Sequence, residues 1–113
     1  METRFVYITA ANMQEAKKIG RILVKKRLAA CVNLIDAMQS MYWWEGTVQE
    51  SRETVLIAKT TKQLVSALTA VVKENHSYEC PCIVSLPIVA GNPAFLKWIF
   101  DETGAPPIPE EYP

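Results

Sequence analysis

The sequence predicts an α+β sandwich with a split βαβ pattern, in which an antiparallel sheet carries its helices on one face. Strand-type and helix-type segments follow one another in the order strand, helix, strand, strand, helix, strand, helix, and the middle two strands form one long hairpin. Right-handed crossovers place both long helices on the same face of the sheet. With 113 residues the chain is expected to form one domain over residues 1–104.

The first strand is expected at residues 5–9 (FVYIT), which are β-branched and aromatic. Asn12 can then cap a helix together with Glu15 three positions later. This helix is predicted to run to about Leu28. Its buried stripe consists of Ala16, Ile19, Leu23 and Leu28, and its opposite, solvated face carries Lys17, Lys18, Arg21 and Lys25.

Residues 31–44 and 47–60 are predicted to form the hairpin, with its turn at Glu45-Gly46. Two arms of about 14 residues at about 3.3 Å each would span about 46 Å, whereas a compact chain of this size is only about 34 Å across. The hairpin must therefore bend or reach past its own subunit. A bulge is expected at Gln39-Ser40, next to Asp36.

The second half of the chain is expected to contain a helix, a strand and a shorter helix. Thr61 is the predicted cap of the helix, with Leu64, Leu68 and Val71 or Val72 at helical spacing up to Asn75. A strand is predicted at residues 82–89 and a third helix at residues 94–103, between Asn92-Pro93 and Gly104. Phe95 and Trp98 on that helix are expected in the core or at an interface. Residues 105–113 form a proline-rich, acidic tail.

Both faces of the predicted sheet are apolar. In the first strand Phe5 and Tyr7 alternate with Val6 and Ile8, and the last strand alternates in the same way, with Val84, Leu86 and Ile88 against Ile83 and Val89. One face is left without helices, and the hairpin tip, Tyr42-Trp43-Trp44, is too apolar to face water. We therefore expect a homo-oligomer with high thermal stability.

Composition excludes several function classes. Twelve basic residues balance twelve acidic ones, so neither nucleic acid nor a membrane surface is an expected partner. No apolar run has the length of a signal sequence or a membrane span. Three cysteines, an odd number, favour a reducing compartment and hence the cytoplasm. No nucleophile with an adjacent base, catalytic carboxylate pair or phosphate loop is visible, so an enzyme is not expected.

Five motifs in this order resemble the CutA1 family of divalent-cation tolerance proteins. They are LAACVNL at 28–34, MYWWEG at 41–46, IAKTT at 57–61, HSYECP at 76–81 and FLKWI at 95–99. The resemblance implies a ferredoxin-like fold and a homotrimer in which sheets pack around a threefold axis and hairpins pair between neighbours. It also implies a role in the response to metal ions, copper above all. A further likeness to PII signalling trimers suggests an alternative function, a sensor with a small metabolite in an inter-subunit cleft.

The candidate metal ligands are His76, Cys80 and Cys82. Neutral imidazole suits copper and zinc, and two thiolates on one side of a strand suit Cu(I). The alternatives are a hydrogen-bonded histidine at a helix end and buried strand cysteines. Copper binding in the family is associated with a histidine pair and a strand cysteine, whereas this chain has Asn75 beside His76, Ile8 in the strand, and Ser77 in place of the usual proline.

A second candidate site is an aromatic cleft between subunits. Its charged and aromatic members would be Trp43, Trp44, Glu45 and Lys59, which could hold a small anion or zwitterion. The alternative is interface packing with one charge pair. Four further residues complete the predicted cleft or interface: Cys31, here a small apolar residue, Tyr42, Tyr78 and Glu79.

Overall fold

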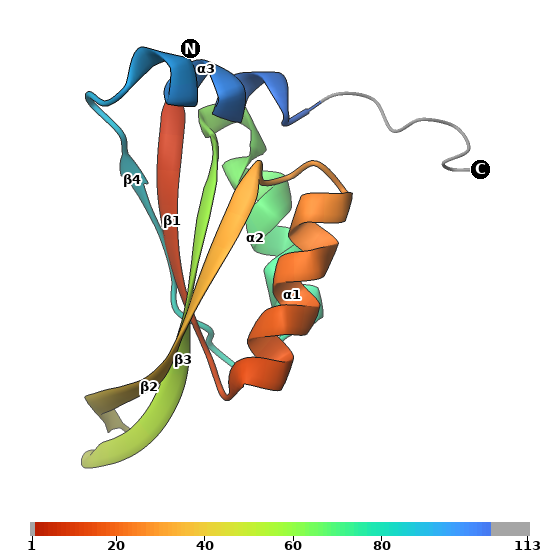
Figure 1. The fold of residues 1–113 in the computed structure, drawn as a ribbon. Helices are drawn as coiled ribbons and strands as arrows, with labels where there is room; N and C mark the ends of the chain where they lie inside the picture. The colour runs from red at the N-terminus through yellow and green to blue at the C-terminus, as the bar shows by residue number, and fades with distance from the viewer. Residues whose placement is uncertain (1, 105–113) are drawn as a thin grey trace.

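The computed structural model describes residues 2–104 and confirms the split βαβ sandwich (Figure 1). The predicted tail at 105–113 lies outside the described residues. One antiparallel sheet has the strand order β2-β3-β1-β4. In chain order the elements are β1 (Thr3–Ala10), α1 (Met13–Lys25), β2 (Cys31–Trp44), β3 (Thr47–Thr61), a 3-10 turn (Lys62–Leu64), α2 (Val65–Glu74), β4 (Ile83–Pro87) and α3 (Pro93–Asp101).

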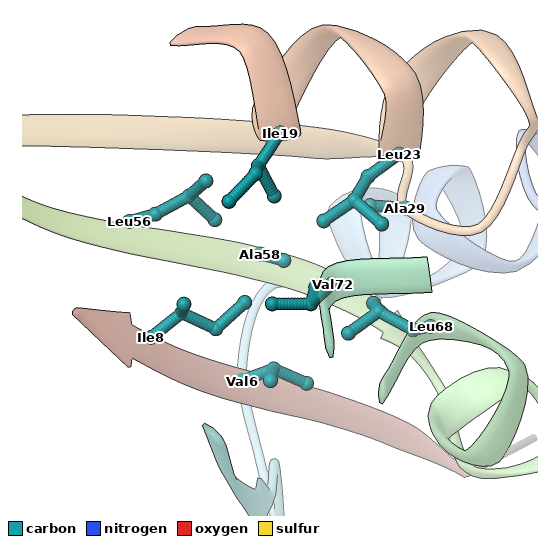
Figure 2. Close-up of a cluster of buried hydrophobic side chains, with 9 residues drawn as sticks. All are labelled: Val6, Ile8, Ile19, Leu23, Ala29, Leu56, Ala58, Leu68 and Val72. Atoms are coloured by element: carbon teal, nitrogen blue, oxygen red, sulfur yellow. The ribbon is translucent and has the colours of Figure 1, made fainter. Parts of the chain in front are cut away.

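The core lies between the sheet and the two long helices. Helices α1 and α2 cover the same face, and α3 lies at the end of the sheet (Figure 1). Side chains from β1 and β3 meet those of both helices (Figure 2), and the nine members of this cluster are Val6, Ile8, Ile19, Leu23, Ala29, Leu56, Ala58, Leu68 and Val72. The predicted stripe of α1 supplies two of them, and its four predicted basic residues are all exposed.

Helix α1 ends at Lys25, before the predicted end at Leu28. Arg27 takes a left-handed backbone conformation with φ 59°, and the N–H of Leu28 then donates to the carbonyl of Leu23 at 2.9 Å. Leu28 still packs against the core, although from the loop. The side chain of Arg27 reaches Glu102 at 3.0 Å and so ties this corner to the end of α3.

The expected cap at Thr61 is wrong. Thr61 is the last residue of β3, where it pairs with Thr3, and its side chain makes no capping hydrogen bond. Because the strand continues that far, a 3-10 turn intervenes and α2 begins only at Val65. Strand β4 is also shorter than predicted, five residues from Ile83.

The hairpin has the predicted turn, and its bulge lies at Asp36-Ala37, just before the predicted Gln39-Ser40. Glu45 and Gly46 have φ values of 49° and 84°, the pattern of a tight two-residue turn. The register shifts between Ile35 and Met38, and Ala37 at the bulge has φ 62°. Figure 1 shows the hairpin tip curving away from the side that α1 covers, and the longest dimension of the molecule is 45 Å.

The sheet face opposite the helices, which we call the open face, is apolar as expected. Ile35, Val84 and Leu86 lie on it with about half of their surface exposed, at 54%, 49% and 52%. On α3 the rings of Phe95 and Trp98 stack with centroids 5.4 Å apart, but both are exposed, and the residue that α3 buries is Ile99. The core alternative for Phe95 and Trp98 is therefore wrong.

Candidate functional site

A groove of about 690 Å³ lies between the open face and the curved half of the hairpin. Strand β1 supplies its floor, the hairpin one wall, and the segment between α2 and β4 the other. The lining residues are Tyr7, Thr9, Met38, Gln39, Ser40, Met41, Tyr42, Trp44, Gln49, Glu53, Tyr78, Glu79, Cys80 and Cys82. Its volume is typical of a small-molecule site.

The bulge decides which hairpin side chains enter the groove. After the register shift Met38 stands opposite Glu53, and alternation then places Ser40, Tyr42 and Trp44 on the same side. The hydroxyl of Tyr7 donates to the sulfur of Met38 at 3.3 Å, which fixes the hairpin against the floor. A shift of one residue would turn these side chains to the opposite side.

Glu53 is an acidic residue that is only 8% exposed. Its Oε2 accepts a hydrogen bond from the hydroxyl of Tyr78 at 2.8 Å. Burial raises the pKa of Tyr78, and the hydrogen bond to Glu53 and the negative charge of Glu53 raise it further. Tyr78 therefore stays a neutral donor. None of the ion pairs formed among residues 2–104 involves Glu53.

His76 holds the wall of the groove in place. Its side chain is fully buried, Nε2 lies 2.8 Å from the carbonyl oxygen of Thr9, and Nδ1 accepts from the N–H of Tyr78 at 3.0 Å. A neutral imidazole with its proton on Nε2 satisfies both contacts. The rings of His76 and Tyr78 also lie 4.7 Å apart. The hydrogen-bonded alternative for His76 therefore describes its role in this structure.

Glu15 ties the same segment to the start of α1. Its two carboxylate oxygens accept from the backbone N–H groups of Ala11 and Ser77, at 2.9 and 2.7 Å, while Oε1 lies 3.9 Å from Nδ1 of His76. Burial opposes ionisation of Glu15, but the hydrogen bonds from Ala11 and Ser77 hold its pKa below the ordinary value.

The cysteines lie where the sequence did not place them. Cys80 and Cys82 both precede β4 and are exposed, so the expectation of buried strand cysteines is wrong; Pro81 between them interrupts strand pairing. Partial burial of the sulfur, and then the charge of Glu53, raise the pKa of Cys82. Cys31 is half-buried at the start of β2. Binding of Cu(I) by Cys80 and Cys82 stays a prediction.

The described part of one subunit does not gather a set of ligands for a divalent cation. Residues 2–104 contain no group of three or more histidine, cysteine, aspartate or glutamate side chains placed to share a metal ion. His76, Cys80 and Cys82 are thus not gathered into one ligand set. Both nitrogens of His76 are already used in hydrogen bonds.

The predicted charged and aromatic cleft is not assembled within one subunit. Trp44 lines the groove, but Trp43 is 74% exposed on the opposite side of the hairpin, and Glu45 is in the turn. Lys59 lies far from the hairpin tip. Its amino group donates a hydrogen bond to the side chain of Asn33. Tyr42, Tyr78 and Glu79 do line the groove.

Glu53, Tyr7 and Met38 are groove residues that the sequence analysis missed. The signal for Glu53 was present, since this acidic residue directly precedes the apolar run TVLIA of a central strand. The side that Met38 faces depends on the bulge register.

No helix within residues 2–104 has the length and apolar character needed to cross a membrane.

The chain matches known proteins over almost all of its described length. The family model for "CutA1 divalent ion tolerance protein" matches residues 4–102. A rice protein, "Protein CutA 1, chloroplastic", is 43% identical over 98 residues, which are 87% of this chain and 55% of that protein. The divalent-cation tolerance protein CutA of Archaeoglobus fulgidus is 43% identical over 99 residues, 88% of this chain and 95% of its own.

The chain thus spans about half the length of the rice, Arabidopsis thaliana and mouse relatives, and nearly all of the archaeal one. Solved structures agree with the fold. A crystal structure of CutA1 from Oryza sativa has a TM-score of 0.89 at 40% identity and covers 92% of this chain and 95% of its own. The Thermus thermophilus protein has the same TM-score at 41% identity, with 90% and 99% covered. With this ferredoxin-like α+β fold, the chain belongs to the CutA1 divalent ion tolerance protein family.

Proposed function

We propose that this protein is a homotrimeric divalent-cation tolerance protein that acts by binding and assembly and catalyses no reaction. The observation that carries the proposal is the open face of the sheet, where Ile35, Val84 and Leu86 are about half exposed. Burial of such a surface releases roughly 25 cal/mol per Å². Three sheets packed around an axis would cover it, and the exposed hairpin tips would reach the neighbouring subunits.

The role in metal tolerance rests on the family and on the names of its relatives. Because residues 2–104 of one subunit contain no cluster of three such ligands, we propose that the assembled protein responds to copper or another divalent ion at its surface, between subunits or through a partner. The cytoplasm is the proposed location, supported by three free cysteines. The rice relative is named chloroplastic, and the structure from Archaeoglobus fulgidus is described as periplasmic.

The test is a comparison of copper tolerance in cells that lack their own protein of this family. The wild-type gene is expected to restore growth in Cu(II), whereas Leu86→Glu, which puts a charge on the open face, is expected to fail. Lys18→Glu, a charge change on the exposed face of α1, is the matched control and should restore growth. Equal growth with and without the wild-type gene would refute the tolerance role.

Titrations of the assembled protein with Cu(II), Cu(I) and Zn(II) test direct metal binding. We expect His76→Gln to leave the affinity for each ion unchanged, because both ring nitrogens are engaged. Replacement of both Cys80 and Cys82 by Ser is expected to weaken Cu(I) binding alone, since thiolates are soft ligands. Loss of submicromolar Cu(II) binding in His76→Gln would instead make His76 a ligand.

A second candidate function is that of a PII-like sensor that binds a small metabolite. The groove of about 690 Å³ favours it, because it combines aromatic walls with a nearly buried carboxylate. Trp44 lines the groove, so its fluorescence should change when nucleotides, amino acids or amines bind to the assembled protein. A fluorescence signal that none of these compounds alters, together with no heat of binding, would reject the sensor function.

A further inference from the structure

We propose that the groove, which in the assembled trimer would form one wall of a cleft between subunits, is a binding site for a small organic amine in its ammonium form, held by Glu53 and by the aromatic side chains around it. This inference deepens the sensor function by naming the ligand class, and it rests on that function. The site combines Glu53 and Tyr7, which the sequence motifs do not include, with aromatic residues that they do include.

Glu53 is an acidic groove residue with little access to water. The residue is 92% buried, its Oε2 is occupied by the hydroxyl of Tyr78, and none of the described ion pairs includes it. A carboxylate with little access to water is stabilised by a nearby positive charge or by further hydrogen bonds. Because Glu53 lines the groove, a cation that enters there would lie beside its carboxylate.

The walls of the groove around Glu53 are rich in aromatic side chains. Tyr7, Tyr42, Trp44 and Tyr78 all line the same groove, with the thioether of Met38 at its floor. The faces of aromatic rings carry negative potential and attract cations, most strongly when the site is shielded from water. Lysine and arginine are absent from the lining, whereas a site for an anion would need them.

The described residues do not fit a bare divalent metal ion as the occupant of the groove. A divalent cation requires several oxygen, nitrogen or sulfur ligands at about 2.0–2.6 Å, and the described residues present no such group of three. An ammonium ion needs only one carboxylate oxygen as acceptor and apolar walls for its carbon chain.

The experiment is isothermal titration of the assembled protein with three probes of similar shape: butylammonium, 1-butanol and butyrate. We expect butylammonium to bind with a dissociation constant of about 1 mM or lower, and the other two at least about tenfold more weakly. Glu53→Gln should weaken butylammonium binding at least about tenfold, whereas Glu50→Gln, on the other side of β3, should leave it unchanged.

A second pair of variants covers the case in which Glu53→Gln does not fold. Tyr42→Leu removes an aromatic wall near the tip and should weaken butylammonium binding, while Trp43→Leu, on the opposite side of the hairpin, should not. The proposal is overturned if butylammonium fails to bind at about 10 mM, if 1-butanol binds as tightly, or if Glu53→Gln binds it equally well. A heat of binding for butyrate or another anion in the groove would contradict the proposed ligand class, but it would remain consistent with the sensor function.

Discussion

At the level of single residues, the connection between α2 and β4 is ordered by buried polar contacts. Glu15 accepts two backbone N–H groups, His76 joins Thr9 to Tyr78, and Tyr78 donates to Glu53. The chain of contacts runs from the start of α1 to the groove. These hydrogen bonds hold the irregular segment in place without a strand or helix of its own.

Glu15→Gln tests this network through its pH dependence. The folded-state pKa of Glu15 lies below the ordinary value of 4.5, so its stabilisation is fully present above about pH 4.5 and is lost as the pH falls through the folded pKa. We expect the variant to be less stable by about 1–2 kcal/mol at pH 7, and the difference to shrink towards pH 3. Guanidinium unfolding at both pH values measures it.

The control for Glu15→Gln is Glu74→Gln, an exposed change at the end of α2. It should alter the free energy of unfolding by no more than about 0.5 kcal/mol at either pH. A pH-independent loss in Glu15→Gln would mean that shape, and not the ionised carboxylate, carries the contribution.

At the level of elements, the hairpin depends on its turn and its bulge. Gly46 has φ 84° with no atom near the position of a Cβ, and Ala37 has φ 62° although it carries a Cβ. Asp36 supports the bulge, accepting from the N–H of Ala37 at 2.7 Å and from the hydroxyl of Thr54 at 2.9 Å. The two positions share a left-handed backbone and differ in whether glycine occupies it.

Reciprocal substitutions at these positions should have opposite effects on stability. Gly46→Ala is expected to destabilise by about 1 kcal/mol, and Ala37→Gly to stabilise by about 0.5–1 kcal/mol, because a Cβ is unfavourable at positive φ. Guanidinium midpoints of both variants against wild type provide the comparison. A loss of stability in Ala37→Gly would show that chain entropy outweighs backbone strain at the bulge.

The sequence predicted the elements better than their ends and better than the groove. Hydrophobic periodicity located all the strands and helices, and Glu45-Gly46 located the turn, because these signals are local. The strand character of Thr61 depends on its pairing with Thr3, which lies far away in sequence. The end of α1 at Lys25 goes with the left-handed backbone of Arg27, which the hydrophobic pattern does not reveal. The groove needs the bulge register and the His76 contacts together, so only Tyr42, Trp44 and the 78–82 segment could be foreseen.

At the level of the whole molecule, a single subunit leaves its open face and hairpin tip uncovered. Phe95, Trp98 and Phe100 on α3 add further exposed aromatic surface. Isolated soluble subunits rarely present so much apolar surface unless another protein surface covers it. The same reasoning predicts that stability depends on association.

Thermal unfolding is therefore expected to depend on protein concentration. Association favours the folded state by mass action, so the midpoint should rise by a few degrees for each tenfold increase in concentration. We also expect a midpoint above the range of about 45–65 °C that is typical of mesophilic domains. Differential scanning calorimetry at several concentrations measures both, and a concentration-independent midpoint within that range would oppose an obligate assembly.

The most direct test of the central claim is the solution mass by light scattering at micromolar concentration. We expect about 38 kDa, three times the chain mass of 12.7 kDa, for wild type and for Lys18→Glu. Leu86→Glu should shift the mass towards that of a single chain, because it buries a charge in the assembled open face. A wild-type mass of about 12.7 kDa would contradict the account.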